Sequence, residues 1–169
     1  MPIPVVTLIG KSGSGKTTLM EGLISELSRR GYRVATVKHH SHSGFEVDYD
    51  GKDSWRHARA GSVHVIIAAP DKIASYRTLK QELLLAEIVK EVHEADLILV
   101  EGYKQAGYPS IEVMRSDVGK ELIGTREQRF AVAADFFVSI DVPLFGLDDI
   151  IGISDLIEQH YLRNSIVKP

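Results

Sequence analysis

Apolar residues occur along the chain in short runs that alternate with longer amphipathic stretches. The run Ile3–Ile9 is almost continuously apolar and rich in β-branched residues. This pattern predicts a strand buried on both faces, as in a parallel sheet covered by helices. In Lys16–Arg30, apolar residues repeat at helical spacing and charged residues fall on the opposite face, and Gly31 provides a helix stop. The chain is therefore predicted to begin with a strand, a turn and a helix.

The same alternation continues to the end of the chain. Further strands are expected at Tyr32–Lys38, Val63–Ala69, Ile73–Arg77, Asp96–Val100, Ile111–Met114 and Phe130–Ala134. Further helices are expected at Lys52–Ala60, from a capping box at Thr78 and Gln81 to about His93, and from a cap at Ser154 to Tyr161. Strands that alternate with helices predict a three-layer α/β fold with a mostly parallel sheet flanked by helices. In such sheets, ligands bind beyond the carboxyl ends of the strands.

Composition narrows the function classes without naming one. The 169 residues suit a single domain spanning 1–169, and the absence of cysteine excludes disulfides and thiolate metal sites. A net charge of −3 argues against a general nucleic-acid partner. No apolar stretch approaches the ~20 residues needed to span a bilayer, and no secretory signal is present, so we expect a cytoplasmic protein without a membrane partner.

The segment Gly10–Thr17 reads Gly-Lys-Ser-Gly-Ser-Gly-Lys-Thr and matches G-x-x-x-x-G-K-[ST] at every position. Glycines allow a tight loop whose backbone N–H groups, with the start of the next helix, hold phosphate oxygens. Lys16 would bring a cation to the outer phosphates, and Thr17 would offer a hydroxyl to Mg²⁺. We therefore predict a P-loop NTPase fold and a nucleotide-binding segment made of Gly10, Lys11, Ser12, Gly13, Ser14, Gly15, Lys16, Thr17 and Thr18.

Carboxylates at other strand ends complete the candidate site. Glu101 follows the apolar strand Asp96–Val100, at a position where P-loop proteins hold Mg²⁺ or orient the attacking water. We predict Lys16 and Glu101 as catalytic residues. Asp48 or Asp53 could complete the Mg²⁺ shell, and Lys38 could reach an anion. His39, His40 and His42 share this loop, but their spacing defines no ligand geometry and favours a solvated polar loop.

The base of the nucleotide is only partly constrained by the sequence. The common guanine-reading motif Asn-Lys-x-Asp is absent, because the one asparagine, Asn164, is followed by Ser165 and Ile166. The strand Phe130–Ala134 ends at Asp135, whose carboxylate could accept two hydrogen bonds from guanine. A turn-forming role for Asp135 is nearly as well supported.

Taken together, these residues resemble the molybdopterin-guanine dinucleotide biosynthesis protein B (MobB) family. The resemblance covers Ile3 to about Asp135, and the block between the second and third strands is its specific part. It rests on Gly10–Thr18, Lys38-His39 with His42, Phe45-Glu46-Val47-Asp48, Gly51-Lys52-Asp53-Ser54-Trp55-Arg56, Ala60-Gly61, Leu97–Lys104 and Ala131–Asp135.

The resemblance implies an accessory protein that binds GTP, hydrolyses it weakly and acts when GMP is joined to molybdopterin. It also implies a homodimer that works with the molybdopterin guanylyltransferase, with molybdopterin itself as a further candidate ligand. Slow hydrolysis agrees with the lack of an obvious water-orienting glutamine or cis arginine finger near the phosphates.

Three alternatives stay open. A small-molecule or nucleoside kinase could use Arg115, Arg126 and Arg129 as an arginine lid, although Asp117, Glu121 and Glu127 lie in the same stretch. A non-catalytic module that delivers nucleotide or molybdopterin would share every nucleotide contact. Lys11 resembles the early lysine of dimerising P-loop ATPases, which reaches across to the partner's nucleotide, but a solvated Lys11 is the simpler interpretation.

Overall fold

The computed structural model describes residues 2–40 and 44–163, and these group into two compact units. Of these residues, the first unit contains 2–39 and 84–163, and the second contains 40 and 44–83. The single domain expected over residues 1–169 stays a prediction. Within the described ranges, no helix is both long enough and apolar enough to span a bilayer.

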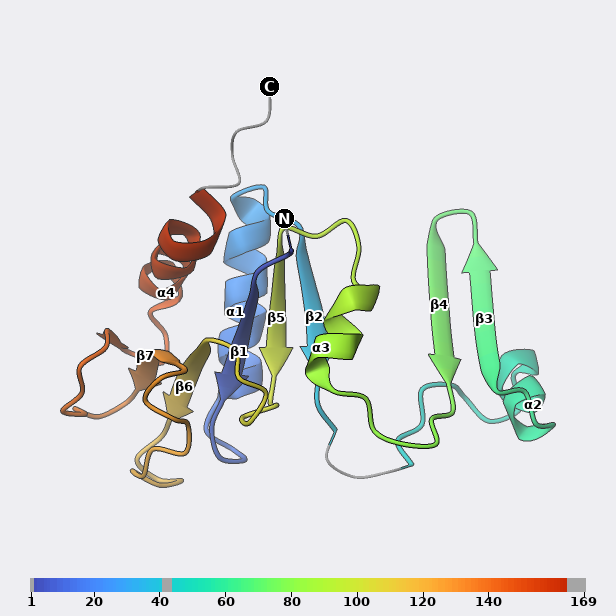
Figure 1. The fold of residues 1–169 in the computed structure, drawn as a ribbon, viewed down its shortest axis with the longest axis horizontal. Coiled ribbons are helices and arrows are strands. Elements are labelled where there is room, and N and C mark those ends of the chain that lie inside the picture. Colours follow the sequence, from blue (N-terminus) through green and yellow to red (C-terminus); the bar gives the residue numbers. More distant parts are fainter. Residues whose placement is uncertain (1, 41–43, 164–169) are drawn as a thin grey trace. The chain divides into compact units, whose positions relative to one another are not determined.

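A six-stranded sheet forms the centre of the first unit (Figure 1). Its strands are β1 (Val5–Ile9), β2 (Val34–Lys38), β5 (Leu97–Glu101), β6 (Ser110–Met114), β7 (Arg129–Ala134) and β8 (Leu144–Phe145). They lie in the order β2-β5-β1-β6-β7-β8, and every pairing between them is parallel. The predicted three-layer α/β fold is confirmed. β8 was not predicted, because two residues give no readable periodicity.

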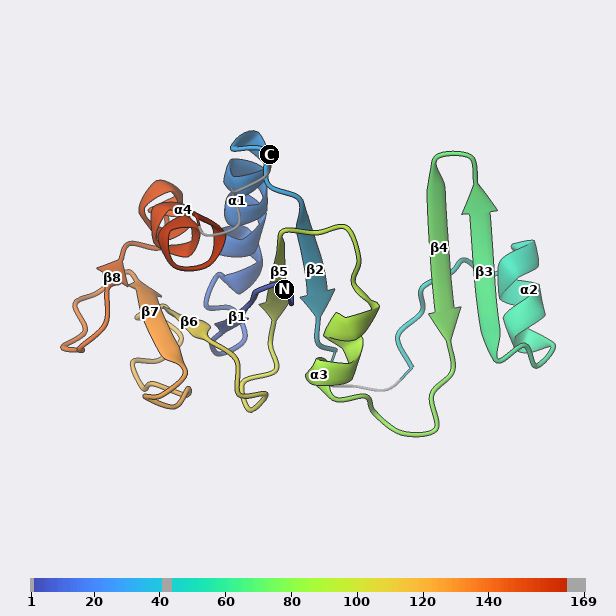
Figure 2. The same ribbon diagram turned by 45° about the horizontal axis from the view of Figure 1, so that its top comes forward.

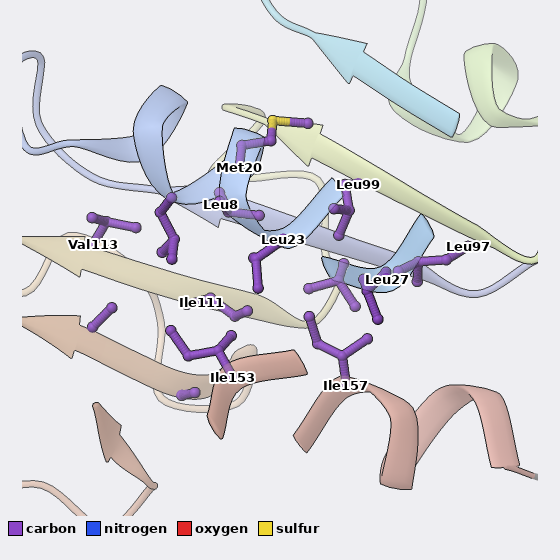
Figure 3. Close-up of a cluster of buried hydrophobic side chains, with 14 of the residues drawn as sticks. Leu8, Met20, Leu23, Leu27, Leu97, Leu99, Ile111, Val113, Ile153 and Ile157 are labelled. Carbon is purple, nitrogen blue, oxygen red and sulfur yellow. The ribbon is translucent and has the colours of Figure 1, made fainter. Parts of the chain in front are cut away.

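One face of this sheet is covered by α1 (Lys16–Arg29), α4 (Ile150–Ile157) and the π-helical turn η2 (Glu158–Leu162). Figure 2 shows α1 and α4 together on that side. Alternate residues of each central strand face the helices, since side-chain direction in a strand has a period of two. Figure 3 shows the resulting core, in which buried strand residues such as Leu8, Leu99 and Ile111 pack against Leu23 and Ile153 of the helices.

The opposite face of the sheet is covered by shorter elements. α3 (Leu85–Ile88) and the 3-10 turn η1 (Val89–Glu91) contribute Leu85 and Val89, which pack against Val5, Ile98 and Val100. Beyond β6, that face is closed by the segment after β7, whose apolar side chains pack on Met114, Val132 and Ala134. Both faces of the sheet are thus buried, which explains the continuous apolar runs of β1 and β5.

The helix expected from Thr78 to His93 is shorter than predicted, and its predicted capping box is wrong. The Thr78 amide donates to the carbonyl of Val63 at 3.1 Å and so prolongs the preceding hairpin. The helix begins instead after Leu84, whose amide donates to the Glu87 carboxylate at 2.8 Å.

The cap of the last helix was also wrongly assigned. Ser154 is fully buried inside α4 rather than at its start. Asp149 is the cap, and its carboxylate accepts a hydrogen bond from the Gly152 amide at 2.9 Å. Aspartate accepts a hydrogen bond from a first-turn N–H group as well as serine does. The sequence alone therefore does not show whether Asp149 or Ser154 is the cap.

The second unit contains α2 (Asp53–Arg59) and an antiparallel hairpin of β3 (His64–Ala69) and β4 (Lys72–Arg77). Both strands were expected, but they form their own two-stranded sheet, because only Pro70 and Asp71 separate them. A two-residue connection permits only antiparallel pairing, whereas a parallel neighbour needs a long crossover. The hairpin leaves large apolar side chains exposed: Val63, Ile66, Ile67 and Ile73.

A charged cluster fastens the last helix of the first unit to α1. Arg30 donates to Glu26 at 2.8 Å, to Asp155 at 2.6 Å and to Glu158 at 2.7 Å. Hydrogen bonds from Arg29 and Arg30 lower the pKa of Glu26 to about 2. The charged form of Glu26 therefore stabilises the native contact between α1 and the C-terminal segment.

We expect Glu26→Gln to lower the melting temperature at pH 7 and to flatten its acid dependence. Because the folded-state pKa is depressed, the stabilisation is present above the unfolded value of about 4.3 and is lost as pH falls toward 2. Thermal unfolding at pH 7, 4 and 2.5 measures this. Glu21→Gln is the matched control, because Glu21 lies on the same helix and forms no ion pair among residues 2–40 and 44–163. Equal pH profiles for wild type and Glu26→Gln would contradict the assignment.

Candidate functional site

The P-loop segment Gly10–Thr17 connects the carboxyl end of β1 to the start of α1, as the sequence predicted. At Gly10, a β-carbon would collide with the backbone carbonyl of Val113 on β6. At Gly15, φ is 99°, in the left-handed region that favours glycine. These two glycines let the loop turn tightly over the sheet edge while it stays in contact with the neighbouring strand.

The start of α1 is open to an anion. Gly15 occupies the cap position and, having no side chain, offers no acceptor to the N–H groups of the first turn. The first N–H groups of a helix have no acceptor within it and carry the positive end of its dipole. The Lys16 ammonium lies over the loop, 3.0 Å from the carbonyl oxygen of Gly10 and 2.8 Å from that of Lys11. Partial burial lowers the pKa of Lys16, although the nearby Glu101 carboxylate opposes the shift.

Thr17, the last residue of the P-loop segment, contacts Glu101 at the end of β5. The Thr17 hydroxyl donates to the Glu101 carboxylate, at 3.2 and 3.3 Å from its two oxygens. Lys38, at the end of β2, places its ammonium 3.3 Å from Glu101 Oε2. The strand order β2-β5-β1 explains this meeting, because Lys38 and Glu101 pair in register at the ends of adjacent strands.

This oxygen pair fits a magnesium ion. Mg²⁺ takes hard oxygen ligands in octahedral geometry at 2.0–2.1 Å, so two adjacent ligands lie about 3.0 Å apart. The Thr17 hydroxyl and a Glu101 oxygen stand at nearly that separation. Two protein ligands are enough for this ion, which keeps several waters and binds substrate phosphates.

These residues line one cleft of about 500 Å³, together with Arg115. The lining is Ser12, Gly13, Gly15, Lys16, Thr17, Thr18, Lys38, Glu101 and Arg115. A volume of this size is typical of small-molecule sites. Arg115 is one of the three arginines that the sequence offers as a lid, and it is the one that lines this cleft. Arg115 lies about 100 residues after the P-loop segment in sequence. It reaches the cleft because it follows β6, which pairs with β1.

Lys11 points away from this cleft. Its ammonium pairs with the carboxylate of Glu121 in the segment after β6, and the contact lowers the pKa of Glu121. Lys11 therefore ties the P-loop segment to residues that follow β6. Its predicted contact with a nucleotide stays a prediction.

Both carboxylate oxygens of Asp135 contact Ser116, in the segment after β6. One of its oxygens accepts from the Ser116 amide at 2.7 Å, and the other lies 3.2 Å from the Ser116 hydroxyl. It is not among the residues that line the cleft. Asp135 fixes the turn that follows Arg115, and its recognition of guanine stays a prediction.

Comparison with known proteins identifies the family. The family model of molybdopterin guanine dinucleotide synthesis protein B, MobB, matches residues 5–135. This chain belongs to the MobB family. The match includes β1, the P-loop segment, Glu101, Arg115 and Asp135.

Curated MobB-family relatives extend the similarity beyond the matched model. The molybdopterin-guanine dinucleotide biosynthesis adapter protein of Haemophilus influenzae is 40% identical over 92% of this chain and 88% of its own length. The adapter protein of Escherichia coli is 35% identical over 92% of this chain and 91% of its own length. The crystal structure of Bacillus subtilis MobB superposes with a TM-score of 0.73 at 25% identity, covering 93% of this chain and 97% of that one.

The remaining predicted residues of this MobB-family chain lie in the second unit. The Asp48 carboxylate accepts from the Tyr49 amide at 2.9 Å and lies 3.1 Å from the Tyr76 hydroxyl. Hydrogen bonds from Ser54 and Tyr49 lower its pKa. Asp53 lies 3.6 Å from Arg56. A metal role for Asp48 or Asp53 stays a prediction.

The histidine loop lies partly outside the described residues, because His42 falls within residues 41–43. In the ranges that are described, no group of three or more His, Asp or Glu residues could hold a metal ion. His39 stacks on Tyr103, with ring centroids 4.3 Å apart. Its amide donates to the Glu101 carbonyl at 2.9 Å.

A buried ion pair that sequence reasoning missed supports the cleft in this MobB-family chain. Glu112 of β6 and Arg129 of β7 pair at 2.9 Å, with side chains 1% and 7% exposed. The Glu112 carboxylate also accepts from the amides of Ile123 and Gly124. This pair anchors the segment between β6 and β7, including Arg115, to the sheet. The two residues lie 17 positions apart, and no sequence signal reveals their pairing, because it depends on β6 and β7 being neighbours in the sheet.

We expect Glu112→Ala to destabilise the protein by about 3–5 kcal/mol, because it leaves the Arg129 guanidinium buried without a counter-charge. Urea unfolding measures the change. Arg126→Ala is the matched control: Arg126 pairs with Asp141 on the surface, where an ion pair contributes about 0–1 kcal/mol. Equal losses of unfolding free energy in the two variants would show that Glu112 does not anchor the segment between β6 and β7.

Proposed function

We propose that this chain is an adapter protein of molybdopterin guanine dinucleotide biosynthesis that binds GTP with Mg²⁺ and hydrolyses it slowly. The pathway follows from membership of the MobB family and from the relatives named as adapter proteins. The ligand is supported by one observation above the others. The P-loop segment, Lys16, Thr17 and Glu101 converge on one cleft at the carboxyl edge of the sheet.

The guanine base is inferred from the pathway and not from a contact. A product that contains a guanine nucleotide requires a guanine nucleotide as a building block. Asp135 lies at the end of β7, one strand beyond β6, but its oxygens are engaged by Ser116. Guanine recognition by Asp135 would require these contacts to be shared or replaced.

Four side chains of the cleft have a defined part in this proposal: Lys16, Thr17, Lys38 and Glu101. The first-turn N–H groups of α1 and the Lys16 ammonium would hold the phosphates. Thr17 and Glu101 would hold Mg²⁺, which would neutralise charge that develops on the phosphates during hydrolysis. Glu101 would also orient water at the metal. Lys38 would balance the carboxylate when no metal is bound.

The partners in this proposal are a molybdopterin guanylyltransferase, with molybdopterin as a possible ligand, and a second copy of this chain. Exposed Ile66 and Ile73 on the hairpin of the second unit support self-association, because exposed apolar clusters mark interaction sites. We expect the protein to act in the cytoplasm.

Only one of the three arginines on which the kinase alternative depended, Arg115, lines the cleft. Arg126 pairs with Asp141 and Arg129 with Glu112, so neither is available to a transferring phosphate in this arrangement. The remaining alternative, a binding module without turnover, uses the same cleft and differs only in hydrolysis.

We expect GTP with Mg²⁺ to raise the melting temperature of the wild type more than ATP does, and Lys16→Ala to remove most of the effect. A ligand at about 100 times its Kd stabilises the folded state by about 2.7 kcal/mol. Differential scanning fluorimetry with both nucleotides measures this. Lys90→Ala, an exposed lysine on η1, is the control. Equal shifts with ATP and GTP would contradict the guanine assignment, and slow phosphate release distinguishes hydrolysis from binding alone.

We expect Glu101→Gln to remove most of the Mg²⁺-dependent gain in GTP affinity and to slow phosphate release at least tenfold. In EDTA, the same variant should bind GTP as well as the wild type or better, because a negative charge beside the phosphates has been removed. Calorimetric titrations with Mg²⁺ and with EDTA measure both effects. An unchanged response to Mg²⁺ would exclude Glu101 from the metal site.

A further inference from the structure

Arg115 and Glu101 lie on opposite sides of β1, at the carboxyl edge of the same sheet. Arg115 follows β6, whereas Glu101 ends β5, and β1 lies between these two strands. The Nη2 atom of Arg115 lies 3.3 Å from the position that a β-carbon would occupy on Gly15. Arg115 thus stands beside the cap position of α1, while Thr17, Glu101 and Lys38 stand on the other side of the same cleft.

The guanidinium of Arg115 is not committed to a carboxylate. Arg126 and Arg129 of the same connecting segment both form ion pairs. Across the described ranges, Arg115 forms none. The Arg115 guanidinium and the N-terminus of α1 are both positive, so the guanidinium gains no stabilisation from the helix end that it faces. The two together suit an anion, and a guanidinium can donate two parallel hydrogen bonds to one phosphate.

The backbone around Arg115 is held firmly. The amides of Val118 and Gly119 donate to the Arg115 carbonyl at 2.9 and 3.0 Å. Asp135 holds the next residue, Ser116, through both of its oxygens. The ion pair of Lys11 with Glu121 ties the same segment to the P-loop segment. Arg115 is therefore presented by a fixed turn rather than by a free loop.

We infer that Arg115 is a phosphate-binding residue of the nucleotide site and acts independently of the metal. The inference rests on the proposed function and adds a specific contact to it. A nucleoside di- or triphosphate would lie between two sources of positive charge. Lys16 and the start of α1 would hold it from the loop, and Arg115 would reach it from the β6 side. Mg²⁺, Thr17 and Glu101 would act from the β5 side.

The test compares Arg115→Ala and Arg115→Lys with Arg126→Ala, the matched control on the same segment. Calorimetric titrations use GDP and GTP, each with Mg²⁺ and with EDTA. We expect Arg115→Ala to weaken the binding of both nucleotides at least tenfold, by a similar factor with and without Mg²⁺. Arg115→Lys should recover part of the loss. Melting temperatures without nucleotide should match the wild type, because Arg115 is exposed and unpaired with a carboxylate.

Each outcome has a defined meaning. Affinities of Arg115→Ala equal to those of Arg126→Ala would overturn the inference and leave the proposed function standing. A loss seen only with Mg²⁺ would overturn the independence from the metal and place Arg115 in the metal-bound arrangement. Wild-type protein that binds GTP no better than Lys16→Ala does would overturn the proposed function, and the inference with it.

Discussion

The pairing of β1 with a parallel strand on each side is the constraint on which the site depends. β5 and β6 both hydrogen-bond to β1 in parallel register, so three carboxyl ends lie next to one another. β1 continues into the P-loop segment, β5 ends at Glu101 and β6 leads into Arg115. The chemistry of the cleft is assembled by strand order alone, from segments that lie about 100 residues apart.

The C-terminal segment completes this arrangement although it lies beyond the matched family model. Ile153, Ile157 and Leu162 are fully buried in the core that α1 shares with the sheet. Arg30, held by Glu26 of α1, then fixes the register of that segment against α1 through Asp155 and Glu158. Because α1 begins at the P-loop segment, the last helix supports the far end of the element whose first turn faces the cleft.

The sequence predicted the parts of the site that belong to local motifs. Gly10–Thr17 form a continuous motif between a strand and a helix, and Glu101 follows an apolar run, so both could be found from periodicity. Arg115 could be named only as one of three arginines of a lid, and the pair of Glu112 with Arg129 could not be found at all. Which arginine lines the cleft depends on β6 lying beside β1, and the pair depends on burial. The misplaced caps at Thr78 and Ser154 have a similar cause. Several polar residues can begin a helix, and tertiary contacts decide which one does.

The strand order also has a consequence for the newly made chain. β1 and β2 are consecutive in sequence but not neighbours in the sheet, since β5 lies between them. β3 and β4 pair with each other in the second unit. No pair of adjacent strands of the six-stranded sheet is therefore complete until residues 97–101 have left the ribosome. Synthesis proceeds at ~5–20 residues per second, so several seconds pass between the synthesis of the P-loop segment and that of β5, which pairs with β1. During that interval the apolar strand β1 has no partner strand, and, among the described residues, α1 is the only neighbouring element of the core already made that can cover its apolar residues.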